Sequence, residues 1–197
     1  MKTILFVDWE NFRKKIKEVL DFEKQPEFEW HEFNFEELFK LVLNGINIDE
    51  IRFYAGKLEE NKQTLQKSQA LIQAQRLLKN TIEANGFNFI YAGKVRQHGF
   101  EFDAKGNKRP SFKEKGVDVG IAVEMLTKAY DKNIDQCILA SSDSDLQPAV
   151  KELRKRQIKI IYLGFEQNPN KGLSYTTNRT ILIRNAEILK FIPKKII

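Results

Sequence analysis

The sequence has little cysteine, proline or glycine: Cys137 stands alone, with five prolines and ten glycines. One cysteine excludes an intramolecular disulfide and a cysteine-based zinc site, and its apolar surroundings indicate a buried thiol. No apolar run approaches the roughly 20 residues that a membrane-spanning helix needs. A strand-like run follows residues 1–2 directly, in place of a signal peptide. We therefore expect a cytoplasmic protein without a membrane segment.

The charge that is present is basic. Lysine and arginine number 33 against 27 aspartate and glutamate, which gives a net charge of +6. A basic balance favours contact with polyanions such as nucleic acid. Hydrophobic residues make up 42% of 197 residues, enough for one globular domain with a sizeable core. We therefore expect a single domain over residues 1–197.

Apolar patterning alternates between strand and helix. Short apolar runs predict strands, and apolar residues three or four apart predict helices. The expected strands are 3–7, 50–55, 87–92, 136–140 and 158–163. The expected helices are one carrying Phe12, Ile16, Val19 and Leu20, one at 34–43 with Leu38, Leu41 and Val42 on one face, and others at 60–85, 117–130 and 145–156. The tail at 180–192 is expected to hold a last strand or helix. This alternation predicts an α/β fold with a parallel sheet covered on both faces.

Two segments break the alternation. Residues 21–33 are rich in glutamate and aromatics and are interpreted as a loop or short insertion. Residues 93–115 are polar and basic, with a turn signal at 105–108, and predict a hairpin or flexible arm. Its cations, Arg96 and Lys113 among them, could contact a substrate, although a charged hairpin that merely stays soluble is an equal alternative.

Carboxylates gather where strands end. Asp8 follows the first strand, Asp143 and Asp145 follow the strand at 136–140, and Asp118 begins the helix at 117–130. Each has a plain structural reading as a helix cap or a first-turn residue. Asp8 is harder to explain in that way, because a carboxylate at the end of a buried strand is desolvated. Asn11, one turn later, can face the same crevice.

Together these carboxylates predict a cation site. Carboxylates that converge at one sheet edge repel one another, and a divalent cation removes that repulsion. Neither histidine nor cysteine accompanies them, which favours Mg²⁺ or Mn²⁺ over zinc. Such ions activate water at a phosphodiester. An acidic centre in a basic chain is therefore typical of an enzyme that cleaves nucleic acid.

Three motifs contain the candidate residues, namely FVDWENF at 6–12, KGVDVGIA at 115–122 and SSDSDLQPAV at 141–150. They resemble the signature segments of the NYN domain, the LabA-like branch of the PIN-like nucleases. The resemblance implies a Rossmann-like three-layer α/β/α sandwich with a mainly parallel central sheet. It also implies a divalent-metal-dependent endoribonuclease, and we expect single-stranded RNA as the substrate. It covers about a fifth of the chain clearly, and nothing in 21–112 takes part.

Carried over by position, the resemblance gives each residue a role. Metal and catalysis would fall to Asp8, Asp118, Asp143 and Asp145, with Asn11 helping to position the site. Ser142 would be a supporting polar group near metal or phosphate. The flanking cations take no role from the resemblance. Lys115 could hold a phosphate or pair with a carboxylate, with simple solvation an equal alternative, and Arg96 and Lys113 are candidate substrate contacts of the basic arm.

Two other functions stay open at this point. One is a catalytically weak or inactive RNA-binding or regulatory module of the same fold. The other is a haloacid-dehalogenase-type phosphatase, which also uses an aspartate after its first strand. That class needs a second aspartate two residues later, where this chain has Glu10. The sequence leaves a homodimer open and gives neither the physiological RNA nor the number of metal ions.

Overall fold

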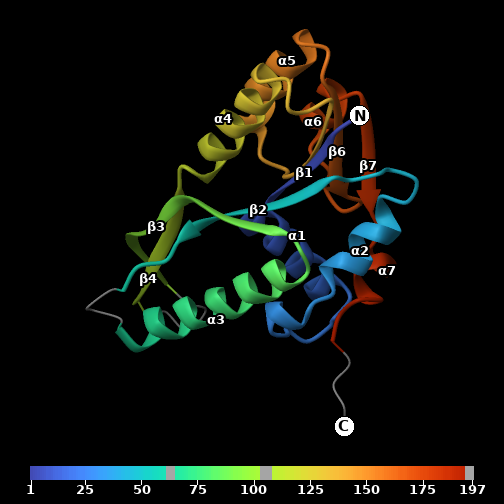
Figure 1. Ribbon diagram of the computed structural model, residues 1–197. Coiled ribbons are helices and arrows are strands. Elements are labelled where there is room, and N and C mark those ends of the chain that lie inside the picture. The colour runs from blue at the N-terminus through green and yellow to red at the C-terminus, as the bar shows by residue number, and fades with distance from the viewer. Residues whose placement is uncertain (61–64, 103–107, 194–197) are drawn as a thin grey trace.

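A computed structural model describes residues 1–60, 65–102 and 108–193 (Figure 1). Its centre is a seven-stranded sheet in the order β4-β3-β2-β1-β5-β6-β7. The strands are β1 (Thr3–Asp8), β2 (Glu50–Lys57), β3 (Asn88–Phe102), β4 (Lys108–Lys115), β5 (Gln136–Ala140), β6 (Lys159–Phe165) and β7 (Arg179–Ile183). All neighbours are parallel except β3 and β4, which pair antiparallel. The predicted α/β fold with a mainly parallel sheet is confirmed.

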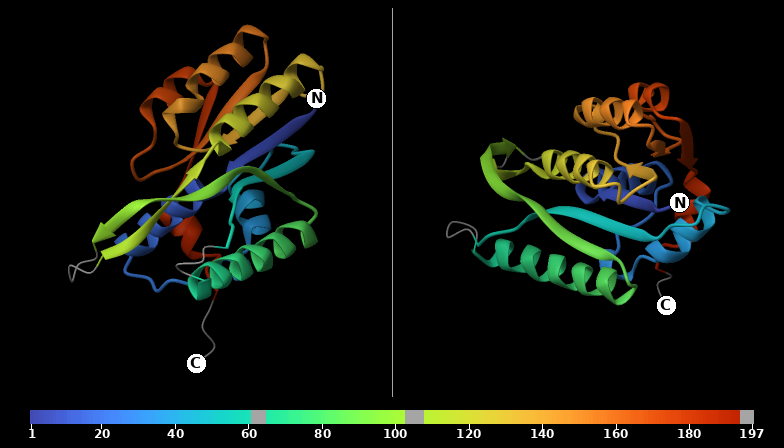
Figure 2. Two further views of the ribbon diagram at one scale, coloured as in Figure 1. Left: turned by 90° about the vertical axis from the view of Figure 1, so that its left-hand side faces the viewer. Right: turned by 45° about the horizontal axis from the view of Figure 1, so that its top comes forward.

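Helices cover both faces of this sheet, as Figures 1 and 2 show. One layer consists of α1 (Trp9–Phe22), α2 (Phe35–Val42), α3 (Leu65–Ala84) and α7 (Asn185–Leu189). The other consists of α4 (Val117–Tyr130), α5 (Gln147–Lys155) and α6 (Lys171–Thr176). Short 3-10 turns lie at η1 (Trp30–Glu32) and η3 (Ser144–Leu146). Each layer has its own apolar core, one packed around α1 and the other around α4.

Every side chain of the strand β1 is buried, as expected of a central strand with helices on both faces. Alternate residues point to opposite faces, so Val7 joins the core beside α1 and Phe6 joins the core beside α4. Helix α1 then buries Phe12 and Ile16, together with its other predicted apolar positions. The predictions for the strand at 3–7 and for the helix after it are confirmed.

Two helix predictions need correction. In α2 the core takes Phe35, Leu38 and Phe39, and Val42 packs against it. The predicted apolar face is therefore right for Leu38 and Val42 and wrong for Leu41, which is exposed. The aromatic side chains shift the buried stripe toward the start of the helix. The helix predicted from 145 begins at Gln147 after a 3-10 turn. Pro148 occupies its first turn, where the missing backbone N–H costs nothing.

The hairpin predicted at 93–115 is present, and its first strand is longer than expected. The strand predicted at 87–92 runs on as β3 to Phe102 and pairs antiparallel with β4. Polar and basic residues hid this extension, since an antiparallel hairpin needs no continuous apolar run. The predicted turn at 105–108 lies largely outside the described residues, as does the start of the helix predicted at 60–85.

Three further expectations concern the tail, the segment 21–33 and a membrane-spanning helix. The tail holds both a strand, β7, and a helix, α7. The start of the segment 21–33 belongs to α1, which ends at Phe22, and η1 is the other regular element in it. Its aromatic side chains Phe28, Trp30 and Phe33 pack in or against the α1 core, whereas Phe22 is exposed. Within the described ranges no helix is long and apolar enough to cross a membrane.

The sheet order creates a switch point. From β1 the chain adds β2 and β3 on one side, and later β5, β6 and β7 on the other. Ligands of open α/β sheets bind beyond the carboxyl ends of the strands where the order reverses. Here that crevice lies between the ends of β1 and β5, at Asp8 and Ser141.

Candidate active site

Asp8 ends β1 with its carboxylate almost wholly buried, 6% exposed. Its Oδ1 accepts a hydrogen bond from the backbone N–H of Asn11 at 3.2 Å, which caps α1. Its Oδ2 accepts one from the hydroxyl of Ser141 at 3.0 Å. The expected helix-capping role is therefore real, and it fixes the orientation of a carboxylate at the switch point.

The loop after β5 is built around the same atoms. The Ser141 hydroxyl also accepts a hydrogen bond from the backbone N–H of Asp143 at 3.1 Å. Asp143 in turn caps the 3-10 turn η3, accepting from the N–H of Asp145 at 2.9 Å. One serine therefore links the carboxylate of Asp8 to the backbone of Asp143.

A second set of bonds holds the backbone of this loop. The side-chain oxygen of Asn11 accepts from the N–H of Ser142 at 2.8 Å. The hydroxyl of Ser142 lies 3.1 Å from that of the fully buried Tyr162. Asn170 donates its backbone N–H to the Tyr162 hydroxyl at 3.0 Å and its side-chain N–H to the Ser142 carbonyl at 2.9 Å. Asn11 and Ser142 therefore hold the loop after β5 in place beside the site.

Asp118 reaches the site from the other side of the fold. It lies in the first turn of α4, directly after the hairpin. Gly116, the residue before that helix, adopts a left-handed conformation with φ of 85°. That turn sends the chain from the sheet edge into α4 and sets Asp118 at the cavity described below.

Glu114, on β4, is an acidic residue that the sequence interpretation overlooked. Its carboxylate accepts a hydrogen bond from the backbone N–H of Gly56 on β2. A Cβ at Gly56 would lie 2.7 Å from the nearer Glu114 oxygen, so glycine makes room for this carboxylate. Burial raises the pKa of Glu114 to about 7, with Glu10 and Asp8 adding to the rise.

Asp8 is perturbed in the same direction. Burial raises its pKa to about 6, and the negative charges of Asp143 and Glu10 contribute, against the lowering effect of its two hydrogen bonds. In both carboxyls burial is the main cause of the raised pKa, and neighbouring negative charges add to it. Such perturbation in a cleft is typical of functional sites.

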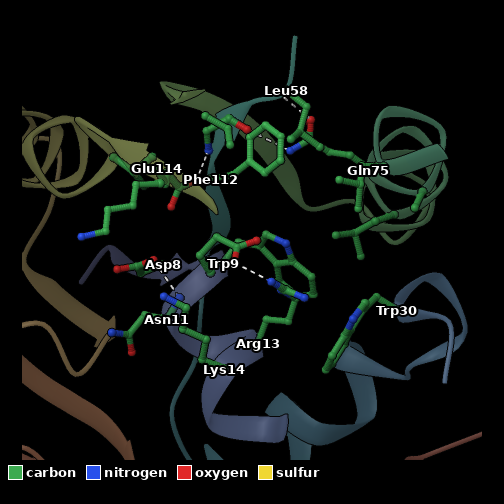
Figure 3. A pocket seen from close by; sticks show the side chains of 18 of the residues that line it. Asp8, Trp9, Asn11, Arg13, Lys14, Trp30, Leu58, Gln75, Phe112 and Glu114 are labelled. Atoms are coloured by element: carbon green, nitrogen blue, oxygen red, sulfur yellow. Dashed lines mark hydrogen bonds and ion pairs between the residues drawn. The ribbon is translucent and has the colours of Figure 1, made fainter. Parts of the chain in front are cut away.

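These groups line one cavity of about 610 Å³ (Figure 3). The acidic residues around it are Asp8, Glu10, Glu29, Glu114, Asp118 and Asp143. Three cations share the lining, namely Arg13, Lys14 and Lys113. Arg13 forms an ion pair of 2.7 Å with Glu10. The cavity therefore combines crowded negative charge with positive charge.

The cavity contains part of the predicted site. Asp8, Asn11, Asp118, Asp143 and Lys113 line it. The exposed side chains of Asp145 and Lys115, and the half-buried Ser142, are not among the lining residues. The side chain of Arg96 falls outside the described residues. Across 1–60, 65–102 and 108–193, no group of three or more aspartate, glutamate, histidine or cysteine side chains is drawn together closely enough to hold a metal ion.

Sequence reasoning missed most of the residues that line the cavity. Glu10 lies within the first motif and Arg13 follows it directly, and their helical spacing could have signalled an ion pair at the site. Trp30 and His31 belong to the segment interpreted as a loop, and no motif marks them. Glu114 reaches the cavity through the antiparallel register of β3 and β4, which composition does not reveal.

Known proteins resemble this chain in fold and in sequence. One solved structure, a protein of unknown function from Vibrio parahaemolyticus, is similar with a TM-score of 0.59 and 19% identity, over 92% of each chain. That likeness concerns the fold alone. No curated protein matches the chain. The NYN domain model matches residues 2–184. The chain therefore belongs to the NYN domain family, a family of PIN-like nucleases.

Proposed function

We propose that this protein is a divalent-metal-dependent endoribonuclease that hydrolyses RNA phosphodiester bonds in the cavity around Asp8. The observation that carries the proposal is the buried Asp8 carboxylate at the switch point, whose pKa is raised to about 6. Asp118, Asp143 and Glu114 face the same cavity from three other segments. A buried carboxylate with further carboxylates around the same cavity has little value for stability and suits a cation.

The side chains fit Mg²⁺ or Mn²⁺ chemically. Carboxylate oxygens are the ligands that these hard ions prefer. Burial is the main cause of the raised pKa of Asp8, the charges of Asp143 and Glu10 add to it, and a bound cation would favour the ionised carboxylate. Asp8, Asp118 and Asp143 would hold the ion, and the exposed Asp145 would act from outside the cavity, through water. A bound ion would supply Lewis-acid polarisation of the phosphate and an activated water. Because the described carboxylates form no ready cluster, the ligands would close in as the ion binds.

The other residues would hold the substrate. Lys14, Lys113 and Arg13 bring positive charge to the rim of the carboxylate set, where backbone phosphates would pass. Asn11 and Ser142 would keep the Asp143 loop in place through their 2.8 Å hydrogen bond. The choice of RNA over DNA rests on membership of the NYN family and is consistent with the net charge of +6.

A non-catalytic RNA-binding module is the second candidate. It is favoured by one observation, that Asp8 and Asp143 both act as helix caps and so have a structural use. Binding without cleavage would be its signature. The haloacid-dehalogenase alternative loses support because Glu10, in the position that class needs, is paired with Arg13 at 2.7 Å.

Cleavage of defined nucleic acids tests the proposal. The wild-type protein and Asp118→Asn would be incubated with labelled single-stranded RNA, duplex RNA and single-stranded DNA, each with Mn²⁺, Mg²⁺ or EDTA. We expect internal cleavage of RNA by the wild type with either ion, and its loss in EDTA and in Asp118→Asn. RNA cleavage that survives both would contradict the metal-carboxylate mechanism. Binding of RNA without any cleavage would favour the second candidate.

A further inference from the structure

The cavity has a second half that metal and phosphate do not explain. In Figure 3, Asp8, Asn11 and Glu114 lie toward one side and Trp30 and Gln75 toward the other, with Phe112 between them. The second side also includes Leu71 and Leu78 of α3. A volume of about 610 Å³ falls within the range of about 300–1,000 Å³ that is typical of small-molecule pockets. The space is therefore large enough for an organic group beside the acidic site.

Trp30 is built as a rigid surface on that side. It lies in η1 and is half-buried. The ring of Trp9 meets it edge-on at 5.5 Å and 84°, and that of Phe28 at 4.9 Å and 60°. Neither neighbour stacks flat on the indole. In the described part of the chain, the faces of Trp30 are therefore not covered by another stacked ring.

Arg13 connects the two halves. It lies between Asp8 and Trp30 in Figure 3, and Glu10 fixes its guanidinium through one Nη at 2.7 Å. Its buried Nε–H has no hydrogen-bond partner among the described residues. Holding a cation with an unpaired buried donor costs stability. That cost indicates that the position of Arg13 serves a ligand.

We propose that the aromatic half of this cavity receives one unstacked nucleobase of single-stranded RNA, which stacks on the indole of Trp30. The inference rests on the proposed function, because it places the adjoining phosphate at the acidic half, with Arg13 between phosphate and base. Aromatic side chains bind splayed-out bases in this way, and every base has a face to offer. A base within a duplex remains paired and cannot enter.

The walls of this pocket come from the part of the chain that the family motifs leave unexplained. Leu71 and Gln75 belong to α3, Phe112 belongs to β4 and Trp30 belongs to η1. Gln75 fixes α3 to the sheet by donating to the Gly56 carbonyl at 2.9 Å. Helix α3 packs against η1, so one side of the pocket is closed over Trp30. Segments outside the three sequence motifs would therefore form the base pocket beside the site.

A scan with abasic nucleotides tests this pocket. A single-stranded RNA with one cleavage site would be made in versions that lack the base at each position near the scissile bond. For the wild type, we expect one abasic position to lower kcat/KM by about 5- to 150-fold, the range for loss of one stacked base. In Trp30→Leu, intact RNA should be cut more slowly, and that abasic position should have no further effect. An abasic penalty that persists in Trp30→Leu would overturn the proposal.

Two more measurements separate this inference from the nuclease proposal. Binding of the same RNAs to Asp8→Asn reads the pocket without cleavage, and it should show the same abasic penalty even if no enzyme activity exists. If Trp30→Leu fails to fold, Ala74→Trp replaces it, because the larger side chain at this exposed cavity residue of α3 narrows the pocket. Tyr175→Leu, 88% exposed and outside the cavity, is the control and should match the wild type. Metal-dependent cleavage with no abasic penalty in either assay would refute the base pocket and leave the nuclease intact.

Discussion

The hydroxyl of Ser141 donates a hydrogen bond of 3.0 Å to Oδ2 of Asp8. The two residues are far apart in sequence and end neighbouring strands, β1 and β5. Their contact orients the buried carboxylate, and it also lowers the pKa of Asp8 against the raising effect of burial. The loop after β5 therefore controls the charge of the residue on which the proposed chemistry depends.

Removal of the Ser141 hydroxyl should move the pH dependence of cleavage. In Ser141→Ala the pKa of Asp8 rises further, so the ionised form that binds a cation appears at higher pH. We expect the acidic limb of the kcat/KM profile to shift toward alkaline pH, measured with Mn²⁺ and single-stranded RNA. Ser144→Ala, an exposed serine of the same loop, serves as the control. An unshifted acidic limb in Ser141→Ala would contradict this coupling.

Asp8 should weaken the metal-free fold as pH rises. Its pKa is 3.8 ordinarily and about 6 when folded, so the folded state holds the proton more tightly. Stability from the neutral carboxyl is present below about pH 4 and is lost as pH rises through 6. Relative to Asp8→Asn, the wild type should lose about 3 kcal/mol of unfolding free energy across that window. Urea unfolding in EDTA measures this difference, and the exposed Asp131→Asn should track the wild type. A pH-independent difference would contradict the raised pKa.

Tyr162→Phe should loosen the same loop from beneath. The substitution removes the hydroxyl that lies 3.1 Å from Ser142 and accepts from the Asn170 N–H. A buried N–H left unpaired costs about 1–3 kcal/mol. Thermal or urea unfolding should show that loss, together with slower RNA cleavage. Tyr175→Phe, 88% exposed, should change neither, and wild-type stability in Tyr162→Phe would count against the role of this network.

Gly116→Ala should disturb Asp118 through the backbone. Gly116 has φ of 85°, and nothing lies within 4 Å of an added Cβ, so any effect comes from backbone strain. A left-handed conformation costs an L-residue roughly 1–2 kcal/mol. We expect a stability loss of that size and a larger relative loss of cleavage. Gly45→Ala has φ of 81° and the same open surroundings far from the cavity, so it should lose stability and keep activity once folded. Equal activity in both variants would refute the link to Asp118.

The sequence predicts the parts of the site that local patterning controls. Asp8 could be found because an apolar strand ends there, and Asp143 because it follows another such strand. Glu114 could not, since only the pairing of β4 with β3, and the space left by Gly56, carry its side chain to the cavity. Trp30 was hidden for a related reason: a single turn between helices has no periodicity.

The role of Asp145 stays a prediction. Its backbone N–H is capped by Asp143 and its side chain is exposed, outside the residues that line the cavity. A 3-10 turn replaces the expected helical start, which changes the direction of each side chain. Hydrophobic periodicity therefore predicted regular elements such as β1 and α1 correctly. It did not predict side-chain directions over a few residues of loop.

The most direct test of the nuclease proposal is the single-turnover rate of RNA cleavage as Mn²⁺ is titrated, compared between the wild type, Asp8→Asn and Asp131→Asn. The proposal predicts a rate that rises to saturation in the wild type and in Asp131→Asn, and that falls by at least about 100-fold in Asp8→Asn, a loss of about 2.7 kcal/mol in transition-state stabilisation. A rate in Asp8→Asn that equals the wild type at every Mn²⁺ concentration would contradict it.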